Sequence, residues 1–323
     1  MKGQGKIAIT SGILILCVVV LTLAPMIHKQ QPSYKMTEQD EQEDNDSENK
    51  VTDKKARAGH PKNDTCIKRL PQAIIIGIQK CGTTTLLTFL NRHPEIVACL
   101  KPVETQFFSG RYSRGLGWYK NLMPCSYANQ ITMEKSPPYF YREFCATRIR
   151  KMNPNIKLII TVKEPIERAI SMYAMLEDYG KVKGIPFEDY VMSNNRTEVR
   201  RDKKMIQFSN YPRYMKFWVK YFDLEQILFI DGDRFVTNPS EELKKVEQFL
   251  GIGNYFTPER FVFNETKGKY CILENGEPSC MAKKKGRPHP TIDPEVRQKL
   301  QQFFKPLNKQ FFKIINRTFD WGY

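Results

Sequence analysis

The sequence contains few residues that bind transition metals. It has only four histidines, scattered along 323 residues, and none of its eight cysteines lies at a zinc-binding spacing. Zinc sites need three or four such ligands close together, so we expect no metal site. No repeat with a period of about 20–50 residues is visible either, which argues against solenoids and propellers.

Acidic residues are outnumbered by basic ones, 35 against 51, and the formal net charge is +16. Almost all of this excess, +14, belongs to residues 70–323. Such a balance indicates an anionic partner: nucleic acid, a membrane surface, an anionic polysaccharide or a phosphorylated cofactor. Because the charge lies in the part of the chain that we expect to fold, it favours a basic cleft over a membrane-surface role.

An apolar run near the N-terminus, residues 7–27, is long enough to span a bilayer as a helix. No small-x-small cleavage motif follows it. We interpret residues 1–6 as a cytoplasmic tail and residues 7–27 as a transmembrane signal anchor, with a cleaved signal peptide as the alternative. The rest of the chain is then lumenal.

Residues 28–69 are polar, with an acidic block followed by a basic one. They show no apolar periodicity, so they are predicted to form a disordered stem. Residues 70–323 are predicted to form the lumenal domain.

Two further features agree with a lumenal location. Cys271 and Cys280 flank a short polar turn, and a disulfide between them would contribute about 2–3 kcal/mol in an oxidising compartment; two free thiols are the alternative. Sequons predict glycosylation at five asparagines: Asn45, Asn63, Asn195, Asn264 and Asn316. A lumenal location excludes ordinary access to nucleic acid.

The pattern of elements in residues 70–323 predicts an α/β fold. Three short apolar runs have the composition of strands buried on both faces: residues 73–76, 158–162 and 227–230. Helical patterns follow them, around residues 86–90, from Ile166 onward and around residues 241–250, with a late helix at 293–304. Alternating strands and helices indicate a central parallel sheet with helices on both faces.

The first predicted strand runs into a glycine-containing loop, residues 77–84. A strand, such a loop and a helix place backbone amides and a helix N-terminus around an anion. In a Walker loop the lysine follows the second glycine, whereas here Lys80 precedes Gly82. The loop therefore predicts a phosphate site that is not that of a nucleotide triphosphatase or a kinase, with a plain glycine turn as the alternative.

Residues 77–87 resemble the 5′-phosphosulfate loop of sulfotransferases that use 3′-phosphoadenosine-5′-phosphosulfate (PAPS). The resemblance covers residues 70–321 and is strongest to the heparan sulfate glucosamine 3-O-sulfotransferases. The other segments that carry it are residues 112–119, 133–140, 229–234, 285–290 and 317–321. It implies a P-loop-like PAPS-dependent sulfotransferase fold and a single-pass type II protein of the Golgi membrane that sulfates heparan sulfate.

The resemblance also implies roles for individual residues. Sulfuryl transfer needs a base for the acceptor proton and cations for the charge on the bridging oxygen, and fixed lysines can supply the latter without a metal. Glu104 matches the general base, and Lys80 and Lys135 match the stabilising lysines. The implied donor-binding residues are Lys80, Cys81, Gly82, Thr83, Thr84, Lys163, Ser171, Tyr270, Lys285, Gly286, Arg287, Pro288 and His289. The acceptor-binding residues are Glu104, Gln106, Lys135 and Trp218.

Several residues depart from the 3-O-sulfotransferase pattern. Gln79 and Thr84 stand where arginines are usual, Gln106 where a histidine is usual, and Ser109 where an acidic residue is usual. The segments around Gln79 and Gln106 look like the N-sulfotransferase domain of heparan N-deacetylase/N-sulfotransferases. The sequence favours the 3-hydroxyl as acceptor, and leaves N-sulfation, another glycan and an inactive glycan-binding protein as alternatives. Retention of Glu104, Lys80 and Lys135 argues against the inactive alternative.

Overall fold

The computed structural model describes residues 65–280 and 289–322. The strands are β1 Ile67–Lys68, β2 Ala73–Gly77, β3 Ile96–Ala98, β4 Cys125–Ser126, β5 Ile131–Lys135, β6 Lys157–Val162, β7 Ile227–Asp231, β8 Phe261–Asn264, β9 Lys269–Glu274 and β10 Glu277–Ser279. The helices are α2 Thr83–Leu90, α3 Gly115–Leu122, α4 Glu143–Met152, α5 Pro165–Asp178, α6 Phe187–Val191, α7 Lys204–Phe208, α8 Tyr211–Trp218, α9 Arg234–Thr237, α10 Pro239–Leu250 and α11 Pro294–Ile315. Within the described ranges, no helix is both long enough and apolar enough to cross a bilayer. The expected anchor, residues 7–27, lies outside them.

A five-stranded parallel sheet in the order β3-β5-β2-β6-β7 forms the centre of the fold. The predicted α/β class and the three predicted strands, now β2, β6 and β7, are confirmed. The strands β3 and β5 were not predicted. β3 has only three residues, and β5 ends in Glu134 and Lys135, so neither is a continuous apolar run.

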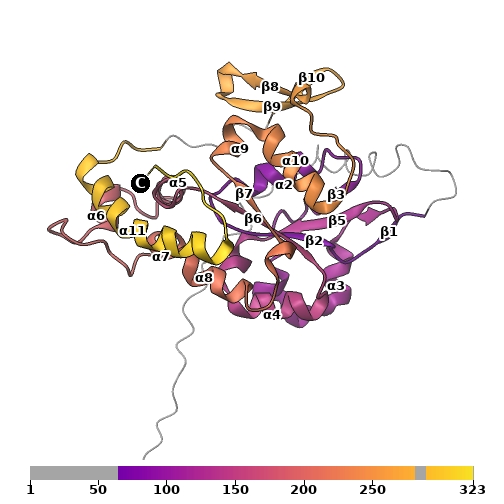
Figure 1. Cartoon of the computed structure of the whole chain (residues 1–323), viewed down its shortest axis with the longest axis horizontal. Coiled ribbons are helices and arrows are strands. Elements are labelled where there is room, and N and C mark those ends of the chain that lie inside the picture. Colours follow the sequence, from indigo (N-terminus) through magenta and orange to yellow (C-terminus); the bar gives the residue numbers. More distant parts are fainter. Residues whose placement is uncertain (1–64, 281–288, 323) are drawn as a thin grey trace, which may run out of the picture. The chain divides into compact units, whose positions relative to one another are not determined.

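Alternate residues of β2 pack into two separate cores, because successive side chains of a strand point to opposite faces of the sheet. Ile74 and Ile76 pack with apolar residues of α3, α4, α8 and the C-terminal half of α11. Ala73 and Ile75 pack with apolar residues of α2 and α10. Helices therefore cover both faces of the sheet (Figure 1).

Helix α11 is longer than predicted, because it continues beyond Pro306 to Ile315. Proline interrupts helical hydrogen bonding, so a helix that ends before it is the usual expectation. Here the first half of α11 buries Leu300 and Phe304 against α5, and the second half buries Phe311 against the sheet. Burial on both sides of the proline stabilises one continuous helix.

The chain after α11 returns to β7, the last strand in the sheet order. The guanidinium of Arg317 donates to the Phe229 carbonyl oxygen at 2.7 Å. The Trp321 ring is parallel to the Phe311 ring, with centroids 6.2 Å apart. These contacts hold the C-terminal segment against the edge of the sheet.

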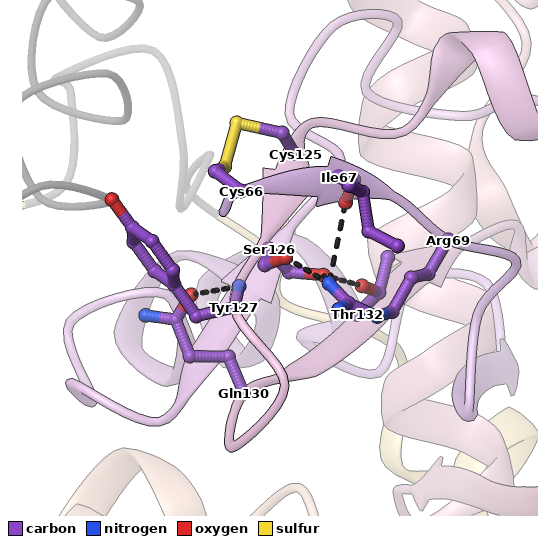
Figure 2. The surroundings of a disulfide bond; sticks show 8 residues. All are labelled: Cys66, Ile67, Arg69, Cys125, Ser126, Tyr127, Gln130 and Thr132. Atoms are coloured by element: carbon purple, nitrogen blue, oxygen red, sulfur yellow. Dashed lines mark hydrogen bonds between the residues drawn. A yellow bond between two sulfur atoms is a disulfide. The ribbon is translucent and has the colours of Figure 1, made fainter. Parts of the chain in front are cut away.

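Two disulfides lie within the described residues. The predicted Cys271–Cys280 bridge is confirmed and links β9 to the residue after β10 in an antiparallel three-stranded sheet. A second bridge joins Cys66 to Cys125, beside the short pairing of β1 with β4 (Figure 2). This bridge was not predicted, because the two cysteines are 59 residues apart and no local turn brings them together. Residues 65–69, assigned to the stem, therefore belong to the folded unit.

We predict that Cys66→Ala lowers the free energy of unfolding by about 2–4 kcal/mol. A bridge that closes a loop of 59 residues strongly reduces the entropy of the unfolded chain, more than a bridge that closes nine. Denaturant unfolding measures the difference, and Cys271→Ala is the matched comparison. An equal or larger loss for Cys271→Ala would contradict the loop-length explanation.

Candidate active site

Several of the predicted site residues follow the carboxyl ends of the parallel strands. The chain leaves β2 toward β3 and β5 on one side, and later continues through β6 to β7 on the other. The crevice outside such a switch point is where α/β sheets bind ligands. The donor loop, residues 78–82, follows β2, and Lys163 follows β6, so they flank this point.

The donor loop ends in the N-terminus of α2. Lys80 and Gly82 both have a positive φ, 76° and 88°, and Gly82 is the N-cap of the helix. A glycine adopts this conformation without steric cost. Thr83 and Thr84 therefore occupy the first helical turn, whose backbone amides have no partner within the helix and can bind an anion.

Cys81 contributes packing to this loop. Its thiol is fully buried and lies 3.9 Å from the Tyr211 hydroxyl. Burial raises the pKa of Cys81 to about 12, so the thiol remains protonated near neutral pH. A role of Cys81 in donor binding is therefore limited to its backbone.

One buried ammonium group connects the donor loop to the predicted base. Lys135 Nζ lies 2.8 Å from Glu104 Oε1 and donates to Thr84 Oγ1 at 3.1 Å. The Lys135 side chain is 1% exposed and that of Glu104 is 23% exposed. The structure thus brings together three predicted residues, although the first and last of them, Thr84 and Lys135, are more than 50 positions apart in the sequence.

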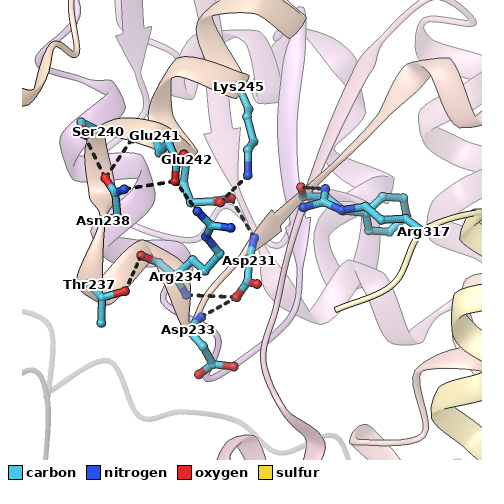
Figure 3. A network of polar contacts seen from close by, with 11 residues as sticks. Asp231, Asp233, Arg234, Thr237, Asn238, Ser240, Glu241, Glu242, Lys245 and Arg317 are labelled. Carbon is cyan, nitrogen blue, oxygen red and sulfur yellow. Dashed lines mark hydrogen bonds and ion pairs between the residues drawn. The ribbon is translucent and has the colours of Figure 1, made fainter. Parts of the chain in front are cut away.

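Lys163 is paired with a carboxylate that was not among the predicted site residues. Its Nζ lies 3.4 Å from Asp233 Oδ1, and Asp233 Oδ2 accepts from the Glu164 amide at 3.0 Å. The Asp231 carboxylate accepts from the Asp233 amide and fixes this turn (Figure 3). A Cβ on Gly232 would lie 2.9 Å from a carbonyl oxygen of the donor loop, so only glycine allows this close approach.

The remaining predicted donor residues are spread over later segments. Ser171 lies partly exposed in α5, and Tyr270 lies on β9 with its ring 5.3 Å from the Phe263 ring. His289 Nδ1 lies 3.6 Å from Glu167 Oε2, at the start of α5. The other residues of the late donor segment lie outside the described ranges: Lys285, Gly286, Arg287 and Pro288.

Glu167 is a pH-dependent anchor for α5 and α11. The contact with His289 and, against the effect of burial, that with Arg297 at 2.7 Å together lower the pKa of Glu167 to about 2. The folded-state pKa is thus below the ordinary 4.5, so the carboxylate stabilises the fold above about pH 4.5. This contribution is lost as the pH falls toward 2.

We predict that Glu167→Gln reduces the free energy of unfolding near neutral pH, and that its difference from wild type shrinks on acidification. Denaturant unfolding at several pH values between 7 and about 3 measures this difference. Glu277→Gln, at an exposed position of β10, is the matched control. A difference that stays constant across this range would contradict the ionic role of Glu167.

Two residues predicted to bind the acceptor lie in different surroundings. Trp218 as a substrate-binding residue is wrong: its side chain is fully buried, and its indole Nε1 donates to the Phe140 carbonyl oxygen at 3.0 Å. It belongs to the core beneath the sheet, where no sugar can reach it. Gln106 is partly exposed beside Glu104, with its backbone amide 3.0 Å from Ser136 Oγ.

The described sequons lie at the surface of the domain. Asn195 and Asn316 are exposed, and Asn264 is partly exposed. Asn45 and Asn63 lie outside the described ranges. Glycosylation at these positions stays a prediction.

A buried carboxyl group beneath the site was also missed. Glu134 precedes Lys135 in β5, is fully buried, and accepts hydrogen bonds from three hydroxyl groups. The only available sequence signal was a glutamate inside a segment that the resemblance already marked.

Comparison with known proteins defines the class. Residues 70–312 match the sulfotransferase domain family. The sulfotransferase of Alicyclobacillus acidocaldarius shares the fold, with a TM-score of 0.58, 20% identity, and coverage of 78% of this chain and 99% of that one. The protein is a PAPS-dependent sulfotransferase.

Curated relatives define the family more closely. Heparan sulfate glucosamine 3-O-sulfotransferase 5 of Mus musculus is 42% identical over 261 residues, which cover 79% of this chain and 75% of that protein. Heparan sulfate glucosamine 3-O-sulfotransferase 3B1 of Mus musculus is 41% identical over 259 residues, which cover 79% of this chain and 65% of that protein. The chain belongs to the heparan sulfate glucosamine 3-O-sulfotransferase family.

Proposed function

We propose that this enzyme transfers a sulfuryl group from PAPS to a glucosamine residue of heparan sulfate, with the 3-hydroxyl as the acceptor. The observation that carries the proposal is the contact of Lys135 with both Glu104 and Thr84. It places a cation between a carboxylate that can take a proton and a helix N-terminus that can bind a phosphosulfate. The names of the relatives support the acceptor.

In the proposed reaction, Glu104 takes the proton of the acceptor hydroxyl while the acceptor oxygen bonds to sulfur. The bond between sulfur and the bridging phosphate oxygen breaks, and its electron pair leaves with 3′-phosphoadenosine-5′-phosphate (PAP). Lys135 and Lys80 stabilise the charge that develops on that oxygen. Lys135 does this without reorganising during the reaction, because the fold already holds its ammonium group between Glu104 and Thr84.

The donor cradle is proposed to bind the two phosphate ends of the nucleotide. The donor loop and the first turn of α2 would bind the 5′ end through backbone amides. Lys163 and Ser171 would bind the 3′-phosphate, with Tyr270 and the segment that ends at His289 contributing beside them. Lys163 is a single charge without the two-pronged geometry of arginine, so its contact should be weaker than that of its usual family counterpart.

We further propose that the enzyme is a single-pass type II protein of the Golgi membrane, with residues 7–27 as the anchor and the catalytic domain in the lumen. The two disulfides support an oxidising compartment. The surface positions of the described sequons agree with it.

The proposal is tested by transfer of labelled sulfate from PAPS to defined heparan oligosaccharides, followed by disaccharide mapping. Label on the 3-hydroxyl of glucosamine supports the proposal. Label on nitrogen would favour the N-sulfotransferase alternative, for which Gln79 and Gln106 are the sequence features. No transfer to heparan, with PAP still bound, would favour another glycan or an inactive glycan-binding protein.

A further inference from the structure

Glu134 and Lys135 are consecutive residues of β5, so their side chains point to opposite faces of the sheet. Lys135 points toward Glu104, as its 2.8 Å contact shows. Glu134 is fully buried beneath. Its Oε1 accepts from the Tyr119 hydroxyl at 2.9 Å, and its Oε2 accepts from Thr105 Oγ1 at 3.1 Å and Ser136 Oγ at 2.9 Å.

The two hydroxyl groups on Oε2 belong to the neighbours of the reacting side chains. Thr105 directly follows Glu104, and Ser136 directly follows Lys135. One carboxylate oxygen thereby joins the segment that carries the base to the strand that carries the lysine. Glu134 is therefore linked to Glu104 through Thr105, and to Lys135 both through Ser136 and by the peptide bond between the two residues.

The same hydroxyl groups also fix the backbone segment that follows Glu104. The amide of Gln106 donates to Ser136 Oγ at 3.0 Å, and that of Phe107 donates to Thr105 Oγ1 at 3.3 Å. The next amide, of Phe108, donates to the Tyr139 hydroxyl, which in turn lies 3.0 Å from Thr105 Oγ1. Three successive amides, those of residues 106–108, therefore donate to hydroxyl groups that contact Glu134 directly or through Thr105.

This backbone would not hold its shape by itself. Gln106 has a φ of 46°, in the left-handed region that is unfavourable for a residue with a side chain. It leads into a short π-helical turn, Phe107–Arg111, and such turns are rare and concentrated at functional sites. External hydrogen bonds are needed to hold such a conformation.

Burial raises the pKa of Glu134, while its hydroxyl contacts act in the opposite direction. A buried carboxyl group is costly, and an apolar side chain would fill this part of the core without that cost. Unlike an apolar side chain, a carboxylate supplies hydrogen-bond acceptors in fixed positions.

We propose that Glu134 is a positioning residue for sulfuryl transfer, which fixes the distance between the base Glu104 and the cation Lys135 through Thr105 and Ser136. The inference rests on the proposed function, in which Glu104 takes the acceptor proton. A displacement of about 1 Å at a reacting group can lower a rate by roughly 10²-fold. Glu134 thus acts on the turnover number and leaves donor binding to the loop after β2.

The test is Glu134→Met, which keeps the length of the side chain and removes both acceptors. We expect the turnover number for labelled sulfate to fall by about 10–100-fold, with an unchanged affinity for PAP in calorimetry. Glu247→Met is the matched control, because Glu247 is also buried, at 2% exposure, and accepts from two amides of the segment after α10. It should lose stability and keep its rate.

A cycle with Glu104→Gln separates positioning from general destabilisation. In the Glu104→Gln background the base is already absent, so Glu134→Met should lower the rate by less than threefold further. Equal effects of Glu134→Met in both backgrounds would overturn the proposal. Wild-type enzyme that transfers no sulfate would instead overturn the proposed function, which distinguishes the two failures.

Thr105 provides a second variant if Glu134→Met does not fold. Thr105→Val removes the hydroxyl group at nearly constant volume, and Thr105→Ser retains it. We expect Thr105→Val to lower the turnover number by about tenfold or more and Thr105→Ser to restore most of it. Equal rates for the two variants would overturn the proposal.

Discussion

Glu104→Gln is expected to lower the turnover number for sulfuryl transfer by about 10²–10⁴, the usual contribution of a general base. Glutamine keeps the size of the side chain and cannot take the acceptor proton. The Glu104 side chain is 23% exposed, so the substitution should have little effect on the fold. The rate is measured with labelled PAPS and a heparan oligosaccharide at saturating concentrations of both.

Donor binding provides the control for this prediction. Glu104 contacts Lys135 and is proposed to face the acceptor, so calorimetry should give Glu104→Gln a wild-type affinity for PAP. Glu265→Gln, at an exposed turn between β8 and β9, is the matched surface variant and should keep the wild-type rate. A rate of Glu104→Gln within a factor of two of wild type would mean that another group is the base.

Lys135→Met is expected to lower the turnover number by about 10²–10³, the usual effect of removing one fixed group that stabilises developing charge. The Lys135 side chain is 1% exposed, so water cannot easily replace its ammonium group. The substitution also leaves Glu104 without its partner at 2.8 Å. The same transfer assay measures the effect.

The matched comparison is Lys163→Met, which removes a lysine from the other side of the switch point. Lys163 is paired with Asp233 and is proposed to contact the 3′-phosphate. We expect it to raise KM for PAPS and to change the turnover number at saturating PAPS only slightly. If the two variants had the same pattern of KM and turnover number, the distinct roles of the two lysines would be contradicted.

The parts of the fold that depend on local composition could be predicted. The runs that became β2, β6 and β7 are apolar on both faces, and buried parallel strands require this pattern. β5 could not be recognised in this way, because its last two residues, Glu134 and Lys135, are charged and interrupt the apolar run. These are two of the residues proposed to act in the site, so the proposed function and the strand pattern place different demands on the same positions.

The site was predictable where short sequence motifs carry the resemblance to the family. The resemblance selected Glu104, Lys135 and Thr84, and the structure brings their side chains together. Roles that depend on contacts across the fold were not predictable. Glu134 and Asp233 act through partners that are distant in the sequence, and the burial of Trp218 follows from the packing of α8 against the sheet.

The C-terminal segment has a consequence for the solubility of the enzyme. β7 is an outermost strand of the central sheet, and an uncovered outermost strand can pair with a strand of another molecule. Arg317 binds a carbonyl group of this strand, and Trp321 packs beside it against α11. Residues 317–321 therefore cover part of this edge and should disfavour its pairing with another molecule. A recombinant enzyme should carry its purification tag at the other end, so that this cover remains in place.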